Sequence, residues 1–261
     1  MLRPQKNLSG TLTYKIKLLP LLGILCCDAN AASSVLLNGN FEAFDISTGN
    51  YNSPISPGNP DGYIVDFGSV VRAYKETATG MGWLTTASDN GIELWKSFAS
   101  ASGGNSSSGT GQYAELNYTE NASLFQDVTI PLAGLVDYGF EHAARNQGTD
   151  VMKVLITYLG ANNIFGDADD SVVVNTNFSS TRPGDRSTPN VWNNFTVDNA
   201  FTSVAGGTYR FSFGAVSTAT GNQTEGNFLD NVRFGIGAVP EPSSALLGSL
   251  GALALLRRRR H

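Results

Sequence analysis

The sequence predicts an all-β domain built from two packed antiparallel sheets. Apolar and polar residues alternate with a period of two in many short segments, such as 151–159 and 208–216. No long segment has the 3.6-residue period of an amphipathic helix, and Gly, Asn, Ser and Thr separate the alternating segments. Because alternation gives each strand one apolar face, about ten such strands bury those faces best in a two-sheet sandwich.

The N-terminal 31 residues have the features of a signal peptide. Four basic residues precede the apolar run LLPLLGILCC, and ANA then offers the small side chains that a signal peptidase reads. We expect cleavage after Ala31. Cys26 and Cys27 leave with the leader, so the mature domain has no disulfide. A lipoprotein is the alternative, but neither cysteine follows the small residue expected before a lipidated cysteine.

The expected strands follow one another through residues 32–238, which we take as one domain. Segments 99–111 and 177–190 are rich in Gly, Ser and Asn and are expected to be mobile surface loops. The strands are expected at 34–42, 62–68, 91–95, 112–117, 123–130, 136–142, 151–159, 171–175, 191–197, 208–216 and 227–234.

Alternation in the last of these segments has a chemical consequence. It places Asp230 on the same face as Phe228, Val232 and Phe234, which directs a carboxylate toward the interior. An unpaired buried carboxylate is costly, so Asp230 requires a cation or several hydrogen-bond donors. The alternative is that Asp230 accepts backbone hydrogen bonds in a turn.

Residues 239–261 differ from the rest of the chain. A proline-rich turn precedes the apolar run 243–256, which is shorter than the roughly 20 residues that span a bilayer comfortably as a helix. A basic end follows, which stays on the cytoplasmic side by the positive-inside rule. The turn consists of Val239, Pro240, Glu241 and Pro242, and the basic end of Arg257, Arg258, Arg259 and Arg260.

This order of turn, short apolar segment and arginine cluster resembles the PEP-CTERM sorting signal of Gram-negative bacteria that produce exopolysaccharide. The resemblance implies recognition by an exosortase in the inner membrane, cleavage near the motif, and delivery to the cell surface or extracellular matrix. Residues 239–242 would be the recognition element. The alternative is an ordinary weak membrane anchor or an amphipathic tail.

Removal of both ends takes away eight of the 17 basic residues, so the mature domain is more acidic than the full chain, whose formal net charge is −5. No basic patch with interleaved aromatic residues is visible, and we therefore exclude nucleic acid as a partner.

The order of motifs in the domain, among them LLNGNFE, GWLTTASDNGIELW, GQYAELN and NFLDNVRF, resembles secreted bacterial domains with a galactose-binding-like jelly roll, including carbohydrate-binding modules. In such folds a structural Ca²⁺ commonly links the first strand to an aspartate of the last. Carried over by position, this nominates Asn40, Glu42 and Asp230 as ligands, with the hard oxygen atoms that Ca²⁺ requires.

Recognition of a glycan needs aromatic rings that stack on sugar faces and planar polar side chains that bond to hydroxyls. The two tryptophans among the candidates can instead be core residues, and the His–Arg pair can be structural, with Glu141 or Asp150 as partner. In the resembled domains a different pair of residues separates this histidine from the arginine. The candidates are Trp83, Asp89, Glu93, Trp95, His142 and Arg145.

The chain has only two histidines, His142 and His261, no cysteine after processing, and no serine in the sequence context of a catalytic nucleophile. We therefore expect a non-enzymatic surface or matrix protein that binds polysaccharide. The alternatives are a purely structural matrix component and, with less support, a glycan hydrolase that uses two carboxylates about 5 to 10 Å apart.

Overall fold

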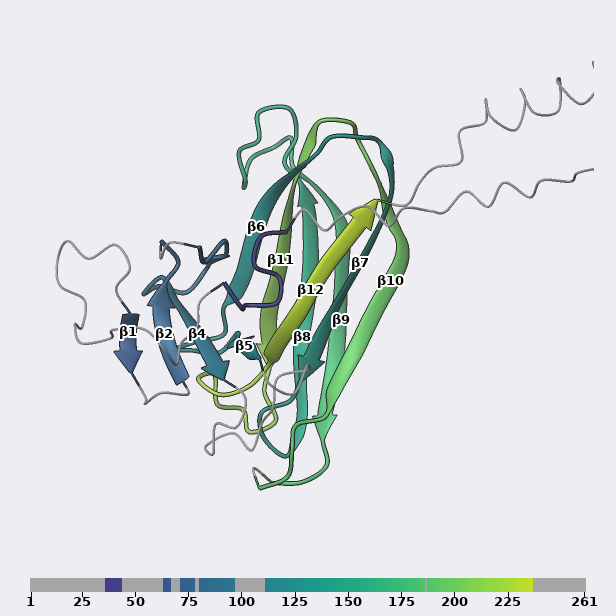
Figure 1. The fold of residues 1–261 in the computed structure, drawn as a ribbon. Coiled ribbons are helices and arrows are strands. Elements are labelled where there is room, and N and C mark those ends of the chain that lie inside the picture. The colour runs from purple at the N-terminus through teal and green to yellow at the C-terminus, as the bar shows by residue number, and fades with distance from the viewer. Residues whose placement is uncertain are drawn as a thin grey trace, which may run out of the picture.

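A computed structural model describes residues 36–43, 63–66, 71–77, 80–96, 111–185 and 187–236. These residues form an all-β structure with two antiparallel sheets, as expected from the sequence (Figure 1). The jelly-roll arrangement stays a prediction. The two terminal helices also stay predictions, because the leader and residues 237–261 lie outside the described residues. The described residues contain no helix that is long and apolar enough to cross a membrane.

The larger sheet has seven strands in the order β1-β2-β4-β5-β12-β7-β10, and the smaller has five in the order β3-β6-β11-β8-β9. In Figure 1, β12 crosses in front of β11 and β8 of the other layer. The strands are β1 (Tyr63–Asp66), β2 (Val71–Lys75), β3 (Leu84–Thr85), β4 (Gly91–Lys96), β5 (Gln112–Glu115), β6 (Ser123–Ile130), β7 (Gly134–Ala143), β8 (Gly148–Tyr158), β9 (Ser171–Arg182), β10 (Trp192–Ser203), β11 (Gly207–Ser217) and β12 (Phe228–Ile236).

The main core lies between the two sheets and follows the predicted alternation. Tyr209, Phe211 and Phe213 of β11 are almost completely buried, and Phe211 stacks on Phe234 of the other sheet with ring centroids 4.6 Å apart. Full burial of each such ring contributes roughly 1.5 to 3 kcal/mol. The inner face of the seven-stranded sheet is therefore covered by the main core, and the residues on its outer face take no part in that core.

Residues 36–43 correct the expected strand at 34–42, because they form successive turns. Asn38 and Phe41 have φ angles of 49° and 56°, which an extended strand does not allow. The segment nevertheless packs on the sandwich, since Phe41 stacks on Trp83 and the Gly39 carbonyl accepts a hydrogen bond of 2.8 Å from the Val232 amide. A Cβ at position 39 would lie 2.1 Å from the Val232 carbonyl oxygen, so the close approach requires glycine.

The predicted loop 177–190 is also partly wrong. Residues 177–182 continue β9 as far as Arg182, where they pair with β8. Small polar residues suggested a loop, but pairing with a long neighbouring strand satisfies their backbone groups and outweighs that local preference. The other predicted loop, 99–111, lies outside the described residues except for Gly111.

Candidate functional site

The outer face of the seven-stranded sheet, which points away from the main core, carries a second aromatic cluster. Neighbouring residues belong to different clusters: Leu229 is in the main core, whereas Phe228 contacts Trp95 and Tyr113 on the outer face. The Phe228 ring centroid lies 5.4 Å from that of Trp95 and 4.9 Å from that of Tyr113. Trp192 of β10 extends the row, 5.4 Å from Tyr113. An aromatic row therefore reaches from β4 to β10.

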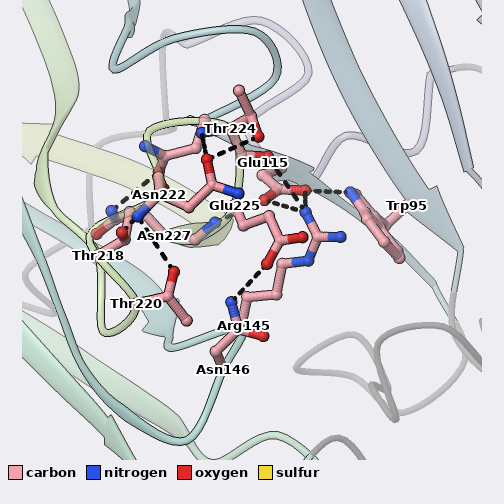
Figure 2. Close-up of polar contacts among 12 residues, drawn as sticks. Trp95, Glu115, Arg145, Asn146, Thr218, Thr220, Asn222, Thr224, Glu225 and Asn227 are labelled. Carbon is pink, nitrogen blue, oxygen red and sulfur yellow. Dashed lines mark hydrogen bonds and ion pairs between the residues drawn. The ribbon is translucent and has the colours of Figure 1, made fainter.

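Beside this row lies a group of residues that we call the acid–arginine cluster: Glu93, Glu115, Arg145 and Trp95. Figure 2 shows the contacts of Arg145 and Trp95 with Glu115. Glu93 and Glu115 face each other across β4 and β5. Arg145 Nη1 lies 2.8 Å and 3.1 Å from the two Glu115 carboxylate oxygens. The Trp95 indole Nε1–H and the Gly226 amide donate further bonds of 2.8 Å and 2.7 Å to Glu115. Glu115 is thus a fully engaged buried carboxylate.

The electrostatics of this cluster favour one proton on the pair of glutamates, with one of the two carboxyl groups neutral and the other charged. Burial, followed by the adjacent Glu115, raises the pKa of Glu93 well above its ordinary value. Burial also raises the pKa of Glu115, but the Arg145 guanidinium opposes that shift. We therefore assign the proton to Glu93 and the negative charge to Glu115, where Arg145 balances it. The guanidinium also lies 4.8 Å from the centroid of the Trp95 ring, within reach of a cation–π contact.

The acid–arginine cluster supports the loop between β11 and β12. In Figure 2 the loop is folded by its own side chains: Asn222 Oδ1 accepts bonds from the Thr224 amide and hydroxyl, and Thr218 donates to the Asn222 carbonyl. Asn146 holds Glu225 from outside the loop with a bond of 3.1 Å. Exposed hydroxyl and amide groups are therefore held in a defined arrangement beside Arg145.

A third buried acid, Asp150, joins the loop to the sheet. Its carboxylate accepts hydrogen bonds from the backbone amides of Arg145, Ala219 and Asn227. These three donors begin and end the loop and anchor the arginine, so one carboxylate fixes the position of all three segments. Burial raises the pKa of Asp150, while the three backbone amides oppose that shift.

Of the six predicted ligand residues, the structure brings together Glu93, Trp95 and Arg145. Trp83 lies in the main core, where its Nε1–H donates to the Asn38 carbonyl. Asp89 lies in the turn before β4 and accepts bonds from the Gly91 amide and the Thr119 hydroxyl. Neither Trp83 nor Asp89 contributes to the acid–arginine cluster.

His142 also lies away from that cluster, in the interior between the sheets. Asn227 donates through its Nδ2 to Asn117 and Ser217, which leaves its Oδ1 as an acceptor for His142 Nε2–H at 3.1 Å. Nδ1 is then an acceptor, and the Ser180 hydroxyl, 2.8 Å from Nδ1 and 2.9 Å from the His142 carbonyl oxygen, shares its one proton between these two acceptors. Burial lowers the pKa of His142 to about 4, consistent with a neutral imidazole that fixes the core.

The predicted calcium ligands lie on two adjacent elements, residues 36–43 and β12. The Asn40 Oδ1 accepts from the Glu42 amide, and the Glu42 carboxylate accepts from the Gln112 amide. The Asp230 Oδ1 lies 2.7 Å from the Asn231 amide. Where the structure describes the chain, no group of three His, Cys, Asp or Glu residues could hold a metal ion. These donor contacts give no positive sign of a shared cation, and calcium stays a prediction from the sequence.

Asp230 is buried, as expected, but the face predicted for it was wrong in part, because it does not share a face with Val232 and Phe234. The pairing of β12 with β7 shifts between Asp230 and Arg233, and Asn231 has a φ of 47°. This β-bulge breaks the alternation, so Val232 and Phe234 join the main core whereas Asp230, opposite Glu141, shares the outer face with Phe228.

The sequence reasoning missed a group of side chains on the same outer face, at β7, β10 and β12. We call this group the polar strip: Glu141, Asn194, Thr196, Asn231 and Arg233. Arg233 Nη2 donates to the Asn194 amide oxygen at 2.8 Å and to the Thr196 hydroxyl at 3.0 Å. The side-chain amide of Asn231 donates a hydrogen bond of 3.0 Å from its Nδ2 to the Glu141 carboxylate. Asn194 and Thr196 are exposed, and the other three are half-buried.

The Arg233 guanidinium lies directly over Gly139, whose lack of a side chain leaves room for it. A Cβ at Gly139 would lie 2.8 Å from the guanidinium carbon. Trp192 precedes Asn194 and Thr196 on the same face of β10 and is also half-buried. The alternation in WNNFT could have located this strip, but only once the face of β10 that points outward was known.

Comparison with known proteins adds one sequence match and several structural likenesses. Residues 238–260 match the family model described as the PEP-CTERM protein-sorting motif, which agrees with the resemblance seen in the sequence. The motif implies export and processing of the C-terminal membrane anchor. A comparison with curated protein sequences found no match.

Among solved structures, TmCBM61 in complex with β-1,4-galactotriose is 14% identical, with a TM-score of 0.37 over 59% of this chain and 88% of its own. A family 35 carbohydrate-binding module from Clostridium thermocellum is 16% identical, with a TM-score of 0.31 over 47% and 76%. The K1 cleaved adhesin domain of Lys-gingipain from Porphyromonas gingivalis W83 is 15% identical, with a TM-score of 0.36 over 60% and 91%. TM-scores this low do not establish a common fold.

Proposed function

We propose that this chain is an exported, non-enzymatic surface or matrix protein that binds polysaccharide through the outer face of its seven-stranded sheet. The sorting motif at residues 238–260 supports the export and exosortase processing of the chain. The acidic composition suits a soluble extracellular domain and gives no support to nucleic-acid binding.

The observation that carries the binding proposal is the polar strip with Trp192 at its end. Two side-chain acceptors already hold Arg233 in place, so little side-chain entropy is lost on binding. Exposed Asn194 and Thr196 offer an amide and a hydroxyl to sugar hydroxyls, and Trp192 offers a partly exposed ring to a sugar face. Neutral sugars suit this strip, because it carries one carboxylate, Glu141, as well as one cation, Arg233.

The acid–arginine cluster supports a structural rather than a catalytic role for its two glutamates. Glu93 and Glu115 are hydrogen-bonded to each other. Glycosidases hold their two carboxyl groups about 5 to 10 Å apart so that a sugar and a water molecule fit between them. The Glu93–Glu115 pair is buried and joined by a hydrogen bond, so no sugar fits between the two carboxyl groups. This favours a binding protein over a hydrolase.

A purely structural matrix component is the second candidate. The burial of most of the aromatic row favours it, because Trp95, Tyr113 and Phe228 are each at most 2% exposed. These three rings stiffen the sheet and are not available for stacking on a sugar.

The test is binding of the purified protein to a panel of immobilised neutral polysaccharides, including galactan, xylan and β-glucan. We expect retention on at least one of them, and loss of that retention in Arg233→Ala and Asn194→Ala. Lys153→Gln on the other sheet is the matched control and should bind as the wild type does. Failure of the wild type to bind any neutral polysaccharide would favour the structural alternative.

A further inference from the structure

The opposite side of the sandwich, the outer face of the five-stranded sheet, has a groove of its own. It has a volume of about 210 Å³ and crosses the central strands β6, β11 and β8. Its lining includes Ser123, Ser212, Gly214, Lys153 and Leu155. None of these residues belongs to the acid–arginine cluster or the polar strip.

The groove exists because the middle strand carries small residues at this point. In the register, Gly214 of β11 lies between Ser123 of β6 and Lys153 of β8. A Cβ at Gly214 would lie 2.3 Å from the Ser123 hydroxyl oxygen, so a larger residue would displace that serine. Ser212 and Leu155 form the neighbouring row of the same face. Glycine and serine thus keep the floor low while the longer Lys153 and Leu155 side chains rise beside it.

The two cations on this face differ in their partners. Arg210 makes a bidentate ion pair with Asp127, with both bonds at 2.7 Å, and its guanidinium lies 4.0 Å from the ring centroids of Phe125 and Phe165. Within the described part of the chain, no hydrogen bond or ion pair engages the Lys153 ammonium. Arg210 is therefore neutralised in place, whereas Lys153 presents an uncompensated charge at the groove.

The ligand that matches this chemistry has a carboxylate beside hydroxyl groups. Lys153 offers the charge, the Ser123 and Ser212 hydroxyls can donate to or accept from sugar hydroxyls, and Leu155 offers an apolar wall. The groove is smaller than the roughly 300 to 1,000 Å³ of drug-sized ligand pockets, so it suits one sugar unit of a longer chain.

We propose that this groove binds a uronic acid unit of an acidic polysaccharide, with the Lys153 ammonium on the carboxylate. The domain then has a second glycan-binding face on the side opposite the polar strip. The two faces share no residue, so each can bind whether or not the other does. Together they would let one domain link an acidic chain to a neutral one.

The acidity of the protein makes the role of Lys153 decisive. The full chain has a formal net charge of −5, so its overall field repels an acidic polymer. Attraction must come from the local cation rather than from the overall charge. Substitution of this single lysine should then have a large effect on binding of polyuronates and little effect on binding of neutral polymers.

The experiment measures binding of the purified protein to polygalacturonate and alginate, with a neutral galactan as the comparison polymer. We expect Lys153→Gln to weaken binding to the polyuronates roughly tenfold or more, in line with loss of a charged hydrogen bond. Lys153→Arg should retain most of the affinity because it keeps the charge. Free galacturonate should compete with polygalacturonate, which distinguishes recognition of the sugar unit from recognition of the polymer.

Three outcomes decide between the two faces. Reduced polyuronate binding in Lys153→Gln with an unchanged Arg233→Ala supports the groove, whatever happens on neutral polymers. Equal polyuronate binding by Lys153→Gln and the wild type overturns the proposed uronic acid site, even if the polar strip binds galactan. No binding of the wild type to any polyuronate also overturns it. Thermal unfolding of both variants controls for folding, and Lys153→Gln should unfold as the wild type does.

Discussion

The acid–arginine cluster and the polar strip lie on the same face of one sheet and contain similar residue types, but their surroundings differ. The Glu115 side chain is completely buried and accepts four hydrogen bonds, and the Arg145 guanidinium lies over the Trp95 ring. Asn194 and Thr196 of the strip are exposed to solvent around an arginine that is already positioned. Charged and aromatic residues alone therefore do not identify a binding site. Exposure separates a cluster that builds the fold from one that can meet a ligand.

Arg145→Ala should give the largest effect of any change on this face. It leaves the Glu115 carboxylate buried without its cation, and removal of one partner from a buried ion pair costs about 3 to 5 kcal/mol. Denaturant unfolding measures the change. The double variant Arg145→Ala/Glu115→Ala should recover part of the loss, because the orphaned charge is gone. A single variant as stable as the wild type would show that the pair is not buried as described.

Trp95→Phe should give a smaller loss in the same assay. The phenyl ring keeps much of the packing on Phe228 but cannot donate the 2.8 Å bond to Glu115. Loss of the donor to a buried acceptor lowers the free energy of unfolding by about 1 to 3 kcal/mol. Loss of stability equal to that of Arg145→Ala would instead indicate that packing of the indole, rather than its N–H, holds the cluster.

The stability of the wild type should depend on pH through Glu93. Burial raises the pKa of Glu93 in the folded protein, so the folded state holds this proton more tightly than the unfolded chain. The contribution is complete below the unfolded pKa and is lost as the pH rises through the folded pKa. Glu93→Gln, which cannot ionise, should flatten that part of the profile. Parallel profiles for the two proteins would contradict the assigned proton.

Arg233→Ala should give the smallest change in stability and the clearest change in binding. Its side chain bonds to exposed partners, and such surface contacts are worth about 0 to 1 kcal/mol. A large fall in the unfolding free energy would place the polar strip with the acid–arginine cluster as part of the scaffold.

The sequence predicted most of the fold because alternation is a local signal. The strand at 123–130 was located to the residue, and the buried faces of β8 and β11 followed from their apolar residues. The short strands β2 and β3 were missed, since 71–75 has no clear alternation and β3 has only two residues. Pairing with longer neighbours creates such strands, and a single segment does not reveal its partner.

The candidate site was less predictable for the same reason. Glu93, Trp95 and Arg145 were found by residue type, but Glu115, which unites them, was not, because its role depends on the register of β5 beside β4. The bulge at Asn231 puts Asp230 and Phe228 on the opposite face from Val232 and Phe234, and local alternation does not signal a bulge. The polar strip required the order of β12, β7 and β10 in the sheet, which is a property of the whole fold.

The most direct test of the central claim is an NMR titration of the protein with oligosaccharides from whichever neutral polysaccharide it retains. We expect shifts that depend on sugar concentration in the signals of Trp192, Asn194, Thr196 and Arg233. The signals of the Glu115 backbone and the Trp95 indole should stay in place. Shifts confined to the acid–arginine cluster and the 218–226 loop, with the polar strip unaffected, would contradict the central claim.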